Sequence, residues 1–313
     1  MDTGLVIQQM LVLFVMMVLG FVAYKIKMLD AHSCTKLSSL IVHILNPAII
    51  INGVLGKDSS QAGNLIAHNL ILIVIMFAIL IVISGPVASL LRVKKENRSL
   101  YQMMTIFSNV GFMGIPVVSS IYGPDAVIYV SFYMLIYNLL LYSLGVWLIS
   151  QNSNQNAKFS FKKMLNTGVI ACLISFVIFG LQIKTPVAVG TFMGYVGNAA
   201  VPMSMIVIGA SMAQADLKEA FRDVKMMLYC LIKLIVIPVI MAVVVQFTSF
   251  DPLLEGVFII MLSMPVGSIV TLLAEEYGAD RTLSSRGIVM TTVLCVVTLP
   301  IVSVIQQAIV MLF

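Results

Sequence analysis

Long apolar segments alternate with short polar connections along the whole chain. We place ten such segments at about residues 5–24, 34–55, 65–91, 99–122, 125–149, 163–183, 187–213, 224–248, 254–277 and 283–312. Each is long enough for the roughly 20 residues that an α-helix needs to cross a bilayer. The pattern therefore predicts an all-α integral membrane protein with ten transmembrane helices and no soluble domain outside the lipid bilayer.

The composition agrees with this interpretation. The chain is 60% hydrophobic and 10% charged, with a mean hydropathy of +1.08, whereas soluble domains have about 45–50% apolar and about 25% charged residues. The first apolar run has no basic residue before it and is followed by Lys25 and Lys27. This is the reverse of a cleavable signal, so we expect the run to remain as the first span.

Basic residues are concentrated in alternate connections. The connections after spans one, three, five, seven and nine contain three, four, three, three and two Lys or Arg residues, whereas the even-numbered connections contain only Lys57 and Lys184. The positive-inside rule then places the odd connections in the cytoplasm and both termini outside a multi-pass cell membrane protein. On this interpretation the net charge of +5 reports orientation, and we expect no nucleic-acid partner.

The two halves of the chain match at a common offset of 155 residues, which pairs Ser108 with Ser263, Tyr122 with Tyr277, Gly123 with Gly278, Asp125 with Asp280 and Pro47 with Pro202. We assign 1–150 to a first five-helix repeat, 151–160 to a cytoplasmic linker and 161–313 to a second repeat. Because five is odd, the second repeat enters the membrane with inverted topology. Inverted repeats are characteristic of secondary transporters.

Two stretches are poorly suited to an unbroken helix. Thr105–Pro116 (TIFSNVGFMGIP) in the fourth span and Ser263–Ser268 (SMPVGS) in the ninth combine glycine, proline and polar residues. We therefore expect both helices to be broken. If the breaks cross, the N-termini of the half-helices meet and offer backbone N–H groups with partial positive charge, which suits a carboxylate.

These stretches supply most of the candidate substrate-binding residues. Asn109 can donate and accept hydrogen bonds, glycines allow close backbone approach, and prolines hold the helices broken. The set is Asn109, Gly111, Gly114, Pro116, Pro265, Gly267 and Ser268. The alternative is helix packing through small residues, which Gly111 and Gly114 could provide by themselves.

Prolines also interrupt the second and seventh spans. Pro47 frees the carbonyl of His43, and Pro202 frees that of Asn198. Asn46 and Asn198 are therefore further candidates for substrate binding, since unwound helices bind substrates or cations in transporters. A packed kink satisfied by neighbouring helices is an equal alternative for both. For His43 we favour packing or a local hydrogen bond.

Lys233 lies roughly nine residues inside the eighth span, and ionisable residues within spans suggest function in lipid. It is a candidate charge partner for an anion, although its stem is long enough to reach the cytoplasmic end. The four cysteines have no metal-ligand spacing, and no nucleotide-binding or zinc-protease motif is present. We therefore expect no enzyme, catalytic residue, metal or cofactor.

At these motifs the chain resembles the auxin efflux carrier family, which includes plant auxin carriers and bacterial permeases for malonate and malate. The resemblance spans nearly the whole chain and rests on Asn109 with Met113-Gly114-Ile115-Pro116, Tyr122-Gly123, Met264-Pro265-Val266-Gly267, Glu276-Tyr277, and Gly287 to Thr292 leading to Leu299-Pro300. It implies a scaffold and a transport domain, with the fourth and ninth spans crossing at the segment of Pro116 and at Pro265. It also implies a substrate carboxylate beside Asn109.

The chain departs from the long plant carriers because it lacks their large cytoplasmic loop. A small metabolic mono- or dicarboxylate is therefore a more plausible substrate than auxin. We expect a secondary carrier of a small organic anion that works by alternating access, and a homodimer is compatible with this expectation. The alternatives are a sodium- or proton-coupled symporter of the bile-acid type, a membrane sensor that binds without transporting, and an intramembrane enzyme.

Overall fold

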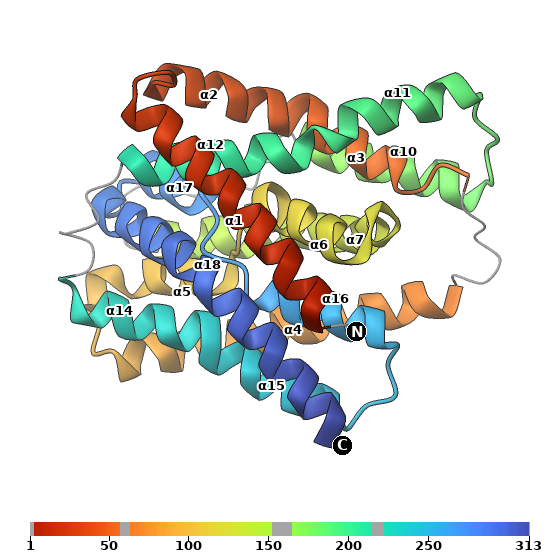
Figure 1. Ribbon diagram of the computed structural model, residues 1–313. Helices are drawn as coiled ribbons and strands as arrows, with labels where there is room; N and C mark the ends of the chain where they lie inside the picture. Colours follow the sequence, from red (N-terminus) through yellow and green to blue (C-terminus); the bar gives the residue numbers. More distant parts are fainter. Residues whose placement is uncertain (1–2, 57–62, 152–164, 215–221, 313) are drawn as a thin grey trace.

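The computed structural model describes residues 3–56, 63–151, 165–214 and 222–312, and this part of the chain is helical throughout (Figure 1). Its only β-type pairing is an isolated bridge between Ser108 and Val266. The linker predicted at 151–160 lies outside the described residues, apart from Gln151. The prediction of an all-helical chain is confirmed for the part that the structure describes.

The helices follow the apolar segments closely. They are α1 (Thr3–Lys25), α2 (Ala31–Leu40), α3 (Asn46–Asn52), α4 (Gly63–Leu90), α5 (Arg98–Ile106), α6 (Ile115–Tyr122), α7 (Val127–Leu140), α8 (Val146–Ser150), α10 (Thr167–Gly180), α11 (Val187–Asn198), α12 (Ala200–Gln214), α14 (Val224–Leu231), α15 (Ile237–Val245), α16 (Pro252–Leu262), α17 (Ile269–Glu276) and α18 (Arg281–Leu312).

Seven helical stretches among the described residues are long and apolar enough to cross a membrane, counting consecutive helices such as α2 and α3 as one. Three further apolar helices are shorter: Val110–Tyr122, Thr167–Gly180 and Pro252–Leu262. Two of these three belong to the predicted fourth and ninth spans. They are short because both spans are interrupted.

The helices form two groups. α1, α2, α3, α10, α11 and α12 contact one another, and α4–α8 contact α14–α18. The first group lies at the top of Figure 1, with α1 crossing in front of the second. Within the first group α1 and α12 approach each other very closely. A Cβ atom on Gly20 would overlap the backbone carbonyl of Ile206, and a Cβ atom on Gly209 would overlap that of Met17. The groups meet where α10 contacts α7, α1 contacts α18, and α12 contacts α6.

Several prolines are accommodated without a break. π-Helical turns at Ile41–Leu45, Val110–Gly114 and Ile232–Val236 immediately precede the helices that contain Pro47, Pro116 and Pro238 near their starts. A proline removes one hydrogen bond of the regular helix, and a local π-turn is a common way to adjust the register around such a site. The fourth span breaks within the predicted stretch Thr105–Pro116, between Ile106 and Val110, but the helix is continuous at Pro116, so the expectation that this proline holds it broken is wrong.

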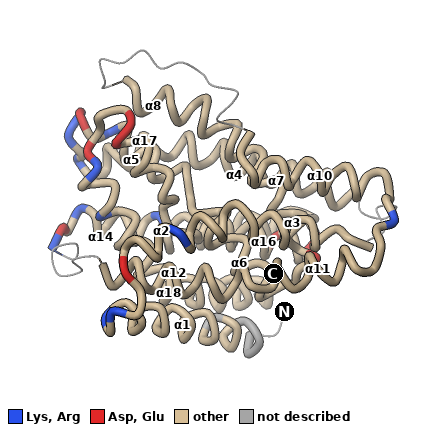
Figure 2. The backbone as a smooth tube through the Cα atoms, turned by 90° about the horizontal axis from the view of Figure 1, so that it is seen from above, with Lys and Arg blue, Asp and Glu red and all other residues tan. Residues whose placement is uncertain are grey.

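Charged residues lie mainly at one end of the helices. Figure 2 shows blue segments, which mark Lys and Arg, near α5, α14 and the α1–α2 connection, and blue also at the opposite end beside α10, where the connection to α11 contains Lys184. This distribution agrees with the alternation of basic connections in the sequence.

Candidate functional site

Two helices are interrupted at the same place in the interior. α5 ends at Ile106, and the next helical turn begins at Val110; α16 ends at Leu262, and α17 begins at Ile269. The two extended segments between these helices lie against each other. Their backbones are joined by the antiparallel bridge Ser108–Val266 and by hydrogen bonds from Asn109 N to Pro265 O (2.8 Å) and from Gly267 N to Phe107 O (2.9 Å). We call this arrangement the crossing.

Gly267 is required for the close approach at the crossing. A Cβ atom at this position would lie 3.1 Å from both the Ser108 carbonyl oxygen and the Tyr137 hydroxyl oxygen. This is tighter than ordinary van der Waals contact, so the other segment would have to move. Gly111 is different, because its Cβ would meet only Met134 at 3.6 Å.

Two helix N-termini meet at the crossing. Asn109 caps one of them: its side-chain oxygen accepts a hydrogen bond from Phe112 N at 3.2 Å. Ser268 precedes the other, α17, and its side chain makes no capping hydrogen bond. In the described part of the chain, the N–H groups of Ser268 and Ile269 have no hydrogen-bond partner. Unpaired N–H groups at a helix start carry partial positive charge and favour anions.

Two adjoining cavities surround these helix starts. The larger has a volume of about 330 Å³ and the smaller about 230 Å³. Val42, Asn109, Phe112 and Ser268 line both. Small-molecule sites typically begin at about 300 Å³, so the larger cavity is of suitable size for a small organic molecule.

The cavity walls are neutral. Amide, hydroxyl and apolar side chains line them, and none of the described lining residues is Asp, Glu, Lys, Arg or His. The polar groups of the larger cavity are those of Asn46, Ser108, Asn109, Tyr137, Asn138, Tyr142, Asn166 and Ser268. A charged ligand would therefore be held by amides, hydroxyls and helix starts instead of by an ion pair.

The structure brings most of the predicted site residues together. Asn109 and Ser268 line both cavities, and Asn46, Gly111 and Gly267 line the larger one. The Asn46 side chain donates to the Gly111 carbonyl at 3.0 Å, so the second span is tied to the fourth. Each of the two groups of helices thus contributes to the same cavity.

Five predicted residues lie outside the cavities: Pro265, Gly114 and Pro116, and also Asn198 and Lys233, which are described below. Pro265 takes part in the crossing through its carbonyl but does not line a cavity. Gly114 and Pro116 are buried farther along the helix, where a Cβ on Gly114 would press on the Met261 side chain. Their positions are explained by packing.

Asn198 requires a correction, because it is exposed and lines neither cavity. α11 ends at this residue, and α12 resumes at Ala200. Its neighbour Gly197 faces inward, where a Cβ would lie 2.8 Å from the Ile49 Cα. Adjacent helical residues point in different directions, so Asn198 faces away. His43 is also exposed and hydrogen-bonds to the Ser39 carbonyl, in agreement with its predicted local role.

Lys233 lies in the wall behind the crossing. Its side chain is 1% exposed, and its Nζ donates to Ser108 Oγ (2.9 Å) and to the Thr105 carbonyl (3.1 Å). The side chain therefore does not extend to the cytoplasmic end. It lines neither cavity but contacts Ser108, which does.

The sequence analysis missed several polar residues of the site. Thr291 of α18 accepts a hydrogen bond from Val266 N at 3.0 Å and so anchors the second segment of the crossing. Asn166 donates to Asn138 Oδ1 at 2.7 Å and also caps α10. The cap could have been found, since Asn before an apolar run is typical of a helix start.

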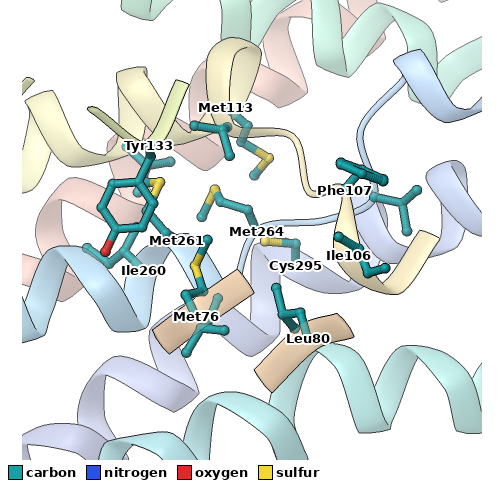
Figure 3. Close-up of a cluster of buried hydrophobic side chains, with 14 of the residues drawn as sticks. Met76, Leu80, Ile106, Phe107, Met113, Tyr133, Ile260, Met261, Met264 and Cys295 are labelled. Atoms are coloured by element: carbon teal, nitrogen blue, oxygen red, sulfur yellow. The ribbon is translucent and has the colours of Figure 1, made fainter. Parts of the chain in front are cut away.

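The crossing is tightly packed on the side facing away from the cavities. Figure 3 shows Met113, Met261, Met264 and Cys295 together in the buried cluster around it. A space of about 10 Å³ lies there, lined by Leu13, Met17, Met113, Val117, Met205, Cys295, Val296 and Leu299. This is barely the space that one water molecule needs, so the packing leaves little room at this point.

Among the described residues there is no group of three His, Cys, Asp or Glu side chains that could hold a metal ion. All four cysteines are free and buried. The buried carboxylate of Glu255 accepts a hydrogen bond from Gln246 at 3.3 Å and lies outside both cavities.

A helical fold with interrupted helices around an interior cavity defines the class of protein as a membrane transporter. The model of the family described as "Membrane transport protein" matches residues 5–161 and 154–303. The chain belongs to this family, the auxin efflux carrier family, which confirms the resemblance seen in the motifs. It is also 27% identical over 303 residues to an "Uncharacterized transporter" of Methanothermobacter thermautotrophicus, covering 95% of this chain and 97% of that protein. Both comparisons point to transport and not to catalysis.

Proposed function

We propose that the protein is a secondary carrier that moves a small organic anion, a mono- or dicarboxylate, across the cell membrane by alternating access at the crossing. The observation that carries this proposal is the meeting of two helix N-termini, at Asn109 and Ser268, in cavities with uncharged walls. Backbone N–H groups at helix starts bind carboxylates well. The side-chain amide of Asn109 adds a directional hydrogen bond.

Particular residues have separate roles in this proposal. Asn109 and Ser268 contact the carboxylate, and Gly111 and Gly267 allow the backbone to approach it. Asn46 lines the cavity from the other group of helices. Pro265 keeps the ninth span extended at the crossing, while Gly114 and Pro116 support the packing of the fourth span.

We further propose ten membrane spans arranged as two inverted five-helix repeats. Positive backbone φ angles support the repeat, because they occur at Lys27 (63°) and Gln182 (52°), and again at Gly123 (84°) and Gly278 (72°). Both pairs have the offset of 155 residues found in the sequence. Positive φ angles are uncommon, above all for non-glycine residues. Their recurrence at the same offset therefore supports an internal structural repeat.

The two groups of helices are suited to alternating access. The group of α1, α2, α3, α10, α11 and α12 would act as the scaffold, and the group containing the crossing would move against it. The larger cavity lies between the groups and is lined by both Asn46 and Asn109. A shift of one group relative to the other would carry the crossing from one membrane face to the other.

The smaller cavity lies toward the basic end of the molecule. Its residues Ser38, Ser211 and Ile288 belong to parts of α2, α12 and α18 that adjoin the odd connections. If those connections are cytoplasmic and the termini outside, as the positive-inside rule predicts, the structure represents an inward-facing state.

Binding can be tested on the purified full chain with acetate, malonate, succinate and malate, with and without sodium and across pH. A ligand that binds only the folded protein raises its thermal stability. We expect stabilisation by at least one carboxylate, and its loss in Asn109→Ala. Asn198→Ala is the matched control, since this exposed side chain lies outside the cavities, and it should bind as wild type does.

Uptake of the same radiolabelled acids into proteoliposomes distinguishes the alternatives. Uptake that is lost in Asn109→Ala and Pro265→Ala, with unchanged membrane insertion, supports the carrier. Dependence on a sodium or proton gradient would favour a coupled symporter of the bile-acid type. Binding without uptake would favour a sensor, and conversion of the acid to a product would favour an enzyme. Wild-type uptake in both variants would contradict the proposed site.

A further inference from the structure

We propose that Lys233 gives the cavity its preference for anions, as a buried positive charge positioned one hydrogen bond behind the cavity wall. This inference rests on the proposed function and assigns charge selectivity to a residue that does not touch the substrate. Ser108 is the link: it lines the larger cavity and accepts a hydrogen bond from Lys233 Nζ at 2.9 Å.

The charge of Lys233 is incompletely balanced by its surroundings. Its second acceptor is the Thr105 carbonyl, 3.1 Å away, at the C-terminal end of α5. A helix C-terminus carries partial negative charge and favours a cation. No ion pair to Lys233 occurs among the described residues, and the ion pairs Lys94–Glu96 and Arg281–Glu275 are exposed and do not involve it. A buried ammonium without a full counter-charge is unfavourable, and a bound carboxylate would supply that charge.

The buried position of Lys233 strengthens the effect of its charge on a ligand in the cavity. Lys233 is 1% exposed, and charges within the protein interior are screened by salt much less than those on the surface. The described residues that line the two cavities include no charged side chain. Lys233 is linked to the cavity wall through its hydrogen bond to Ser108. Its positive charge should therefore favour the binding of carboxylates over neutral molecules of similar shape.

The inference predicts a change in selectivity that a purely structural role would not produce. The test compares malonate with its neutral diamide malonamide, and succinate with succinamide, by calorimetric titration of the full chain in detergent. In Lys233→Met we expect carboxylate affinity to fall by about tenfold, equivalent to about 1.4 kcal/mol, and diamide affinity to remain as in wild type. Lys233→Arg should retain the wild-type preference, because it keeps the charge.

Two other variants complete the test. Lys233→Gln removes the charge but keeps a hydrogen-bond donor for Ser108 and Thr105. It should show the same loss of carboxylate affinity as Lys233→Met, and it provides the test if the methionine variant does not fold. Lys225→Met is the control: this exposed lysine on the preceding helix, α14, donates to the Arg92 carbonyl. It should keep the wild-type ratio of carboxylate to diamide affinity.

The outcomes separate this inference from the proposed function. Equal losses for dicarboxylate and diamide in Lys233→Gln, or no loss for either, would overturn the role of the charge while leaving the carrier intact. Wild-type protein that binds neither dicarboxylate would overturn both. Preserved selectivity in Lys233→Gln together with Asn109-dependent carboxylate binding would leave only the helix N-termini as the source of anion preference.

Discussion

Ser108 and Val266 pair as an antiparallel bridge in the interior of the protein, although they belong to different halves of the chain. Each segment supplies hydrogen-bond partners for backbone groups that the other leaves outside a helix. Backbone groups at membrane depth must be satisfied by the protein, since lipid cannot pair with them. The two interruptions therefore depend on each other, and damage to one segment should affect the other.

Gly267→Ala should disrupt the crossing. The added Cβ would lie 3.1 Å from the Ser108 carbonyl oxygen, and overpacking of this kind typically costs about 1–3 kcal/mol. We expect a lower thermal unfolding temperature in detergent and loss of uptake in proteoliposomes. Gly190→Ala is the control, because its Cβ would meet nothing within 4 Å. Equal stability of the two variants would argue against a tight crossing.

Thr291→Val should destabilise the protein although it preserves side-chain shape. The hydroxyl of Thr291 accepts the hydrogen bond of the buried Val266 N–H, and a buried donor without a partner costs about 1–3 kcal/mol. Thr298→Val, on the same helix, removes a buried hydroxyl that has no partner among the described residues. It should be neutral or stabilising in the same unfolding measurement. A larger loss in Thr298→Val than in Thr291→Val would refute the anchoring role.

The sequence predicted the interruption of both spans and the stretches in which the breaks lie: Ser263–Ser268 in the ninth span, and Thr105–Pro116 in the fourth, where the break is between Ile106 and Val110. Glycine, proline and polar residues identified both stretches, because their intrinsic backbone preferences are local. Pro116 was misleading, since the π-turn Val110–Gly114 absorbs its missing hydrogen bond. The helix instead breaks near Ser108, where the partner segment provides hydrogen bonds. That choice depends on a contact distant in sequence.

Asn46→Ala and Asn198→Ala should differ, although the sequence made both residues candidates for substrate binding with a packed kink as the same alternative. Asn46 is 4% exposed and donates to the Gly111 carbonyl, so its loss leaves an unpaired acceptor and should cost about 1–3 kcal/mol. It should also alter the rate of uptake, because the bond joins the two groups of helices. Exposed Asn198 should change stability by less than about 0.5 kcal/mol. Similar effects of the two substitutions on unfolding would contradict the separate roles of Asn46 and Asn198.

Side-chain direction explains most of what sequence reasoning missed. Asn46 directly precedes Pro47, and Asn198 lies four residues before Pro202, but Gly197 fixes the inward face of α11 against Ile49 and turns Asn198 outward. Thr291 belongs to the motif Gly287 to Thr292, but nothing in that motif distinguishes it from its neighbour Thr292, because threonine is common in membrane helices. The ionisable Lys233 was identifiable from its position, whereas its partners Ser108 and Thr105 emerged only from packing.

The accessible side of the cavity provides the last prediction. Ser211 lines the smaller cavity near the end of α12, whereas Ser204 on the same helix is fully buried. All four native cysteines are buried, so their background reaction with a membrane-impermeant maleimide should be low. Ser211→Cys should react when the reagent is on the side of the basic connections, and Ser204→Cys should not.

Adding substrate tests whether the cavity that Ser211 lines is the binding site. In vesicles of known orientation, a saturating carboxylate that binds at Asn109 should slow the labelling of Ser211→Cys, because both residues line the same cavity. Labelling from the opposite side alone would mean that the topology is reversed or that the outward-facing state predominates. Mapping the α1–α2 connection with a cysteine at Lys27 separates these cases, since it reports topology independently of the cavity. Reaction of Lys27→Cys and Ser211→Cys from the same side is the expected result for an inward-facing carrier.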